Sequence, residues 1–214
     1  MQLKLPVVLI SRTRSQSSGV SSRSPRLGIL TPALLTRMST GPSSARAQAK
    51  QNWPQFRGEA AGVVADDPSL PDSWGPEENV AWEVEVPGRG WSSPIVWGNH
   101  VFALTSTALT GPEVPIQPIE NYRARSLGGS MTAAYITEVD EPIHWVLYDI
   151  DFETGMVRWQ QTLHTAVPSL PTHQKSTFAS ETPVTDGERV YVYLADIGLY
   201  ALDFDGELVW SVAM

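Results

Sequence analysis

The residue types that could carry chemistry in this chain begin with two histidines, His164 and His173, in a proline-rich stretch. An imidazole can ligate a metal ion or act as a general acid or base near neutral pH. The two histidines lie nine positions apart, which fits no common metal-binding motif, and no third ligand stands beside them. This spacing favours packing or exposure in a loop over a site, and the pair is kept as a candidate site only.

A small acidic group, Glu138, Asp140 and Glu141, comes just before Pro142. Carboxylate oxygens bind calcium, but the spacing of this group differs from that of an EF-hand loop. A solvated turn is therefore favoured over a calcium site. No serine is identified as a candidate nucleophile, because the sequence contains no Gly-x-Ser-x-Gly motif. The residue types alone identify no catalytic residue and no metal ligand set.

Charge and cysteine content narrow the classes of partner and cofactor. Residues 59–214 carry six Lys or Arg against 23 Asp or Glu, and an acidic body of this kind repels phosphate backbones. We therefore expect no nucleic-acid partner. The absence of cysteine excludes disulfides, cysteine zinc sites, covalently attached c-type haem and a lipid-modified cysteine within these residues. No apolar run reaches the roughly 18 residues of a membrane-spanning helix, so none is expected.

Residues 1–50 differ from the rest of the chain, since they are basic, rich in serine and free of acidic residues. The tripeptide Ala45-Arg46-Ala47 fits the small-x-small pattern that precedes signal-peptidase cleavage. Three interpretations stay open for this segment: an export signal, an organellar transit segment, or a disordered tail. In each case we expect residues 1–50 to lie outside the folded domain, which would begin at Asn52.

A motif that occurs twice indicates the elements that must position any functional residue. Ser93-Pro94-x-Val96-x-Gly98 returns at the same spacing as Thr182-Pro183-x-Thr185-x-Gly187. A second motif, Asp151-x-x-Thr154-Gly155-x-x-x-Trp159, returns as Asp203-x-x-Gly206-x-x-x-Trp210. A repeating unit of strands, glycine turns and a closing tryptophan is typical of a β-propeller. The sequence thus predicts an all-β fold of four-stranded antiparallel blades.

The repeats divide residues 52–214 into two blades and one further strand. The further strand is predicted over residues 79–86, where polar and apolar residues alternate around Trp82. An insertion at about 106–142 interrupts the first blade, and a shorter one around His164 and His173 precedes the second. Because closure takes about four to eight blades, we expect a partial propeller from the N-terminal part of a longer protein, with the rest of the ring missing.

The characteristic residues of the second motif and its repeat are interpreted as blade-docking residues. A tryptophan at the end of an outer strand can stack on the neighbouring blade and bury roughly 200 Å², and an aspartate before a glycine turn can accept hydrogen bonds from its own backbone. This structural interpretation is favoured over a cofactor role. The residues are Asp151, Thr154, Gly155, Trp159, Asp203, Gly206 and Trp210.

These motifs resemble the docking motif of the pyrroloquinoline-quinone (PQQ)-type propeller repeat, Ala-x-Asp-x-x-Thr-Gly-x-x-x-Trp. The first copy departs from it at Asp149, which stands in the alanine place, whereas Ala201 matches it in the second copy. The segment Trp53-Pro54-Gln55-Phe56-Arg57-Gly58 is similar to the start of exported bacterial proteins of this group. The resemblance covers about residues 52–214 and implies a quinoprotein-like propeller in the periplasm or outside the cell.

The resemblance leaves two functions open. The first is a non-catalytic module that binds or scaffolds a protein or small-molecule ligand on a propeller face, with no cofactor evident. The alternative is the N-terminal part of a PQQ-dependent alcohol or sugar dehydrogenase, which would bind the quinone and calcium. Such dehydrogenases place an adjacent cysteine pair over the quinone, and this chain has no cysteine. The sequence therefore favours the non-catalytic module. The same family includes a lipoprotein of the outer-membrane barrel-assembly machinery, whose cysteine anchor has no counterpart among these residues.

Overall fold

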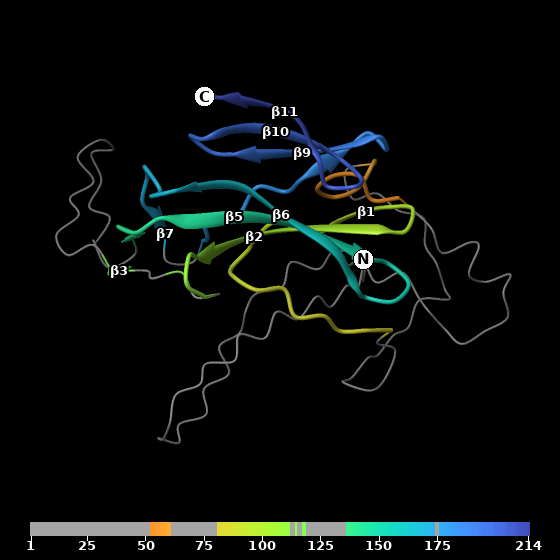
Figure 1. The fold of residues 1–214 in the computed structure, drawn as a ribbon, viewed down its shortest axis with the longest axis horizontal. Helices are drawn as coiled ribbons and strands as arrows, with labels where there is room; N and C mark the ends of the chain where they lie inside the picture. The colour runs from red at the N-terminus through yellow and green to blue at the C-terminus, as the bar shows by residue number, and fades with distance from the viewer. Residues whose placement is uncertain (1–51, 61–80, 112–113, 115–116, 119–135, 174–175) are drawn as a thin grey trace, which may run out of the picture.

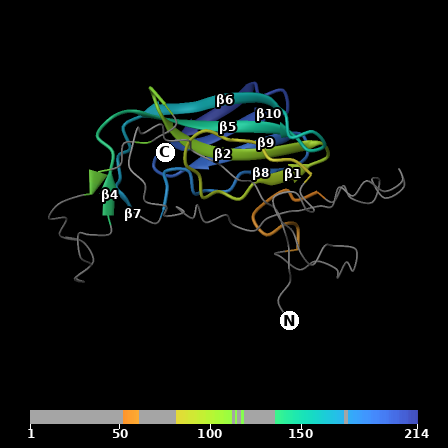
Figure 2. The same ribbon diagram turned by 90° about the horizontal axis from the view of Figure 1, so that it is seen from below.

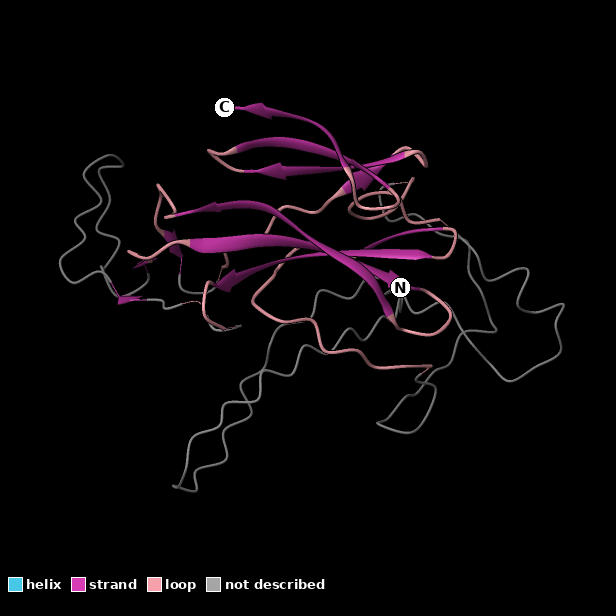
Figure 3. Cartoon of the chain, in the orientation of Figure 1, coloured by secondary structure: helices cyan, strands magenta, loops and turns pink. Residues whose placement is uncertain are grey.

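The computed structural model describes residues 52–60, 81–111, 114, 117–118, 136–173 and 176–214. Within these ranges every regular element is a β-strand, as Figures 1 and 3 show. The predicted all-β class is therefore confirmed. The segment proposed for export and most of the first insertion lie outside the described residues.

The first sheet is an antiparallel meander that corresponds to the first predicted blade. Its strands, in sheet order, are β1 (Ile95–Trp97), β2 (His100–Ala108), β5 (Ile143–Asp151) and β6 (Val157–Ala166). The Gly98-Asn99 reversal joins β1 to β2, and the insertion separates β2 from β5 in sequence. The long middle strands nevertheless pair over their whole length, from His100 opposite Asp151 to Ala108 opposite Ile143.

The second sheet repeats this arrangement without an interruption. Its strands are β8 (Val184–Thr185), β9 (Arg189–Leu194), β10 (Gly198–Asp203) and β11 (Leu208–Ala213), all antiparallel. Figure 1 shows this sheet lying over the first. Two four-stranded antiparallel sheets of this kind agree with the predicted partial propeller.

A third, smaller sheet joins the two insertions and was not predicted from the sequence. It contains β3 (Gln117–Pro118), β4 (Ile136–Glu138) and β7 (Thr172–His173) in that order. The first insertion supplies β3 and β4, whereas β7 comes from the second. Figure 2 shows β4 and β7 together at one end of the larger sheets.

The predicted strand around Trp82 is not hydrogen-bonded as a strand in the described residues 81–86. Its alternation survives, since Val84 and Val86 are more buried than Glu83 and Glu85. A strand needs a hydrogen-bonded neighbour, and none pairs with this segment among the residues that the structure describes. The alternation predicted the buried face correctly, and the pairing of this segment as a strand stays a prediction.

The register separates the two ends of the first sheet. His100 and Asp151 pair at the end that holds the short turns, and Ala108, Ile143 and Ala166 pair at the opposite end. Both insertions leave the sheet at this second end. We call the two ends the turn end and the insert end.

Two apolar clusters hold these elements together. The larger lies between the two sheets, where buried side chains of β2 and β5 meet those of β9 and β10, among them Phe102, Leu147, Val192 and Leu202. The smaller covers the other face of the first sheet and includes Trp53, Val86, Val101, Tyr148 and Ile150. The middle strands β2 and β5 are thus buried on both faces along nearly their whole length, which agrees with their long apolar runs.

Residues 52–54 are hydrogen-bonded to the edge strands β1 and β8, or to the turn that follows β1. The backbone of Trp53 exchanges two hydrogen bonds with Val96 of β1, at 2.7 and 2.9 Å. The Thr185 amide of β8 donates to the Pro54 carbonyl at 2.8 Å, and the Gly98 amide donates to the Asn52 side chain at 2.9 Å. The beginning of the described chain therefore lies beside the β1 edge of the first sheet and the β8 edge of the second.

Candidate functional site

The repeated tryptophans dock one segment onto the next through two contacts each. Trp159 Nε1 donates to the Phe204 carbonyl at 2.9 Å, and its ring covers Gly206. Trp82 Nε1 makes the same bond to the Phe152 carbonyl, also at 2.9 Å, and its ring covers Gly155. Both tryptophan side chains thus pack one segment against the next. In the third position of the series, Trp210 is half-buried and lies 6.0 Å from the ring of Tyr191.

The aspartates of the repeat hold the turns onto which these tryptophans dock. Asp151 Oδ1 accepts hydrogen bonds from the Glu153 amide at 3.0 Å and from the amide and hydroxyl of Thr154 at 2.8 and 2.9 Å. Burial opposes ionisation of Asp151, but the Thr154 bonds and the nearby Arg158 charge together lower its pKa. In the second copy, Asp203 Oδ1 accepts from the amides of Asp205 and Glu207 instead.

The candidate histidines make separate contacts. His164 lies on β6, where its Nδ1 is 2.9 Å from the Tyr200 hydroxyl of β10 and its ring is 5.9 Å from that of Trp145. His173 ends β7 and pairs with Ile136 of β4. Within the described ranges, no group of three or more His, Asp or Glu side chains is placed to hold a metal ion.

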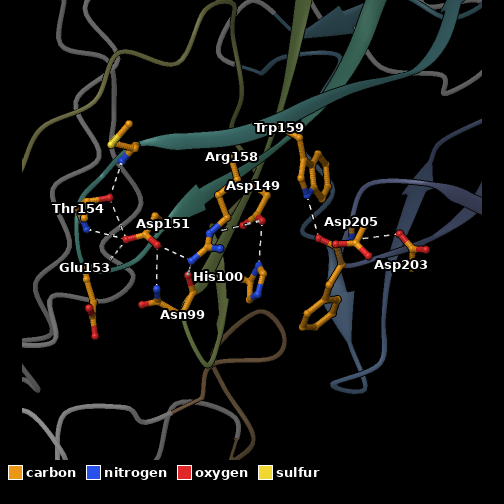
Figure 4. Close-up of polar contacts among 12 residues, drawn as sticks. Asn99, His100, Asp149, Asp151, Glu153, Thr154, Arg158, Trp159, Asp203 and Asp205 are labelled. Carbon is orange, nitrogen blue, oxygen red and sulfur yellow. Dashed lines mark hydrogen bonds and ion pairs between the residues drawn. The ribbon is translucent and has the colours of Figure 1, made fainter.

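A polar cluster at the turn end was missed by the sequence analysis (Figure 4). The Asp149 side chain is completely buried, and its Oδ2 lies 2.8 Å from His100 Nδ1. Arg158 Nε is 4.0 Å from the same oxygen, and Arg158 Nη2 contacts Asp151 Oδ2. Burial raises the pKa of Asp149, although the His100 hydrogen bond works in the opposite direction. The departure of Asp149 from the alanine of the repeat was the signal that could have located this cluster.

The insert end gathers exposed side chains from several segments. Register places the ends of β2 and β6 here, and the β4–β7 pairing adds the small sheet. Ser169 also hydrogen-bonds Asp196 in the turn between β9 and β10, so the second insertion reaches the second sheet. The exposed residues here, apolar and acidic, are Leu109, Glu138, Asp140, Glu141, Val167 and Leu170. The acidic group predicted as a solvated turn is thus exposed.

Part of the chain matches the model of a known protein family. Residues 144–214 match the family model described as outer membrane protein assembly factor BamB. The matched range begins in β5 and contains both copies of the tryptophan motif, so the resemblance to the PQQ-type repeat is confirmed there. No curated protein matches the chain. Searched over the described residues, the chain contains no helix with the length and apolar character needed to cross a membrane.

Proposed function

We propose that this chain, whose residues 144–214 match the family model described as outer membrane protein assembly factor BamB, is a non-catalytic binding or scaffolding module of an exported protein. The supporting observation is the pairing of β4 with β7, which brings two insertions far apart in sequence together at one end of the first sheet. Loops carried on a rigid scaffold are frequent sites of recognition. The partner would be a protein or a small molecule that binds at the insert end.

The division between the two ends of the sheet supports this assignment. The repeated aspartates, glycines and tryptophans lie at the turn end, where their hydrogen bonds and ring contacts serve docking. The insert end follows no repeat motif, and it exposes apolar side chains such as Leu170, which is 60% exposed. Apolar side chains beside carboxylates fit the polar rim and apolar centre of a protein interface.

A capture experiment with a matched control tests the proposed surface. The full chain would be immobilised beside a variant in which a Gly-Ser linker replaces residues 119–135, and beside Glu188→Gln at the opposite end. Envelope extract would be passed over all three, and bound proteins would be identified after crosslinking. We expect captured partners to be lost only from the linker variant, with circular dichroism unchanged. Equal capture by all three proteins would contradict the insert end as the binding surface.

A titration separates this proposal from a quinone-dependent enzyme. The module is proposed to work without a cofactor, so PQQ and calcium added to the full chain should show no saturable binding. A dye-linked assay with alcohols and sugars should likewise show no turnover. Saturable quinone binding accompanied by turnover would contradict the non-catalytic module and would support the dehydrogenase.

Location is part of the same proposal. The matching family is described as outer membrane protein assembly factor BamB, and residues 1–50 contain a small-x-small cleavage pattern. Both observations support a periplasmic or secreted protein. We expect the protein in the periplasmic or culture fraction after expression in a bacterium, with its amino terminus near Gln48. Retention of the uncleaved chain in the cytoplasm would argue against export.

A further inference from the structure

We propose that β11 (Leu208–Ala213) is a docking edge for a second copy of this chain, whose own β11 pairs with it antiparallel and joins the two second sheets into one. The sheet order places β11 at the outer edge of the second sheet, paired with β10 on one side. Figures 1 and 3 show it as the outermost strand of that sheet. Among the residues that the structure describes, no strand pairs with its other side.

The inner edges of the two large sheets are already occupied by the start of the described chain. At the first sheet, Trp53 exchanges backbone hydrogen bonds with Val96 of β1. At the second sheet, the Thr185 amide of β8 donates to the Pro54 carbonyl. Within the described part of the chain, the outer edges β6 and β11 are therefore the places where a large sheet can continue into another molecule.

The two outer edges differ in how well they are protected against such pairing. Both strands carry a bulge one residue before the repeat tryptophan, and the bulged residue is Arg158 in β6 but Val209 in β11. Two residues after the tryptophan, β6 has Gln161 where β11 has Val212. A second bulge interrupts β6 alone. Because charged side chains and bulges keep edge strands from pairing with other chains, β6 is the better protected edge.

The composition and exposure of β11 favour pairing with another strand. Residues 208–213 contain no charged residue and no proline. Leu208, Val209 and Val212 are 51%, 46% and 57% exposed. From Trp210 onward the strand pairs with β10 without irregularity, so its outward backbone groups keep the regular spacing that a further strand needs. An exposed apolar edge of this kind is a template for another chain.

A second copy of the chain meets the requirements for the added strand. The partner needs a free edge of its own, and an uncharged strand avoids like charges opposite each other. The chain carries a formal net charge of −8, so its copies repel each other over most of their surface. Antiparallel pairing also places the exposed Glu207 of the two copies at opposite ends of the joined strands. The contact of β11 with itself around a two-fold axis is a closed, isologous interface.

The concentration dependence of the mass is the first test. A pair of short strands buries less than the roughly 1,600 Å² of a standard interface, so we expect a weak, reversible dimer. The full chain would be followed by analytical ultracentrifugation from about 1 to 100 µM, where its mass should rise from that of one chain toward that of two. A chain that stays monomeric throughout would overturn the proposal. Assembly beyond a dimer would also overturn it, because an isologous interface closes at two copies.

A variant built from the first repeat locates the contact. Val209→Arg combined with Val212→Gln gives β11 the residues of β6, and both positions are exposed, so circular dichroism should be unchanged. We expect the dissociation constant of the dimer to rise about tenfold or more, because apolar cross-strand contacts are lost on both copies. Leu170→Gln, which removes an exposed apolar side chain at the insert end, is the control and should dimerise like the native chain. An unchanged constant in the double variant, or weaker association in the control, would place the contact elsewhere and overturn the proposal.

Cysteine crosslinking tests the antiparallel arrangement of the two strands. The chain contains no cysteine, so a single introduced cysteine can form a disulfide only with its counterpart in another copy. A residue near the centre of the joined strands lies close to that counterpart, within the reach of a disulfide. Under mild oxidation, Ser211→Cys or Val212→Cys should form linked dimers faster than Gln161→Cys, which occupies the position of Val212 in β6. If neither variant crosslinks faster than Gln161→Cys, the pairing of β11 with itself is wrong.

Discussion

Asp186 illustrates how a single carboxylate fixes a turn in this chain. Its Oδ1 accepts hydrogen bonds from the amides of Glu188 and Arg189 at 2.9 and 2.8 Å, and its Oδ2 accepts from the Tyr191 hydroxyl at 2.7 Å. The Tyr191 bond and the two amide bonds lower the pKa of Asp186 from 3.8 to about 2. A lowered pKa contributes stability that is present above 3.8 and is lost as pH falls toward about 2.

Removal of the tyrosine hydroxyl should raise the pKa of Asp186 part of the way back. In Tyr191→Phe the strongest of the three bonds is lost, but the two amide bonds remain, so the pKa should stay below 3.8. The measurement is an NMR titration of the side-chain carboxyl carbon. Tyr193→Phe, two residues along the same strand, is the control and should leave the titration unchanged. An unshifted pKa in Tyr191→Phe would refute the assignment.

The two kinds of polar residue differ in how far sequence could predict them. Asp151, Thr154 and Gly155 lie within one turn, so their hydrogen bonds follow from local spacing. His100 and Asp149 are brought together only when β2 and β5 pair across the insertion. The pairing register could not be read from a sequence in which the two strands are separated by an aperiodic segment. The same holds for His164, whose partner Tyr200 lies on another sheet.

At the scale of elements, the turn that precedes β11 depends on close approach of a tryptophan. Gly206 has a φ of 88°, and a Cβ atom there would lie 2.8 Å from Trp159 Cδ2. Gly98, in the turn between β1 and β2, has a φ of 56° but nothing within 4 Å of such an atom. The two glycines thus share a conformation that disfavours side chains and differ in the space around them.

Alanine at these two positions should separate the two effects. Gly98→Ala should lower the free energy of unfolding by about 1 to 2 kcal/mol through backbone conformation alone. Gly206→Ala should lose a further 1 to 3 kcal/mol or so, because Trp159 must shift. Urea unfolding of both variants of the full chain provides the comparison. Equal losses would mean that the ring of Trp159 can move without cost.

Elements differ as well in how much of them the sequence predicts. The strands of the second sheet are separated by turns that contain Gly187, Gly198 and Gly206, so alternation and turn chemistry define these strands. The strands β3 and β7 contain two residues each, which is too short for any periodicity. Their pairing with β4 depends on where the larger sheets place the two insertions. The small sheet could therefore not be predicted from the sequence.

On the scale of the whole molecule, the repeat predicts the architecture because each copy must bury its face against a neighbour. The larger apolar cluster, between the first and second sheets, is that burial. What the repeat does not specify is the difference between the copies, since a motif describes only what the copies share. The insert end and the contact between His100 and Asp149 both belong to the first copy alone, and both lie outside the predictable part of the fold.

The backbone bonds of residues 52–54 also constrain the order in which the chain can fold. Pro54 leaves the ribosome early, whereas its partner Thr185 belongs to the second sheet and is synthesised far later. Contacts between such distant positions form slowly, since loop-closure entropy opposes them. The Pro54 carbonyl therefore has no Thr185 partner until the second sheet has been synthesised, and the contact through which residues 52–54 join the two sheets is expected to form late in folding.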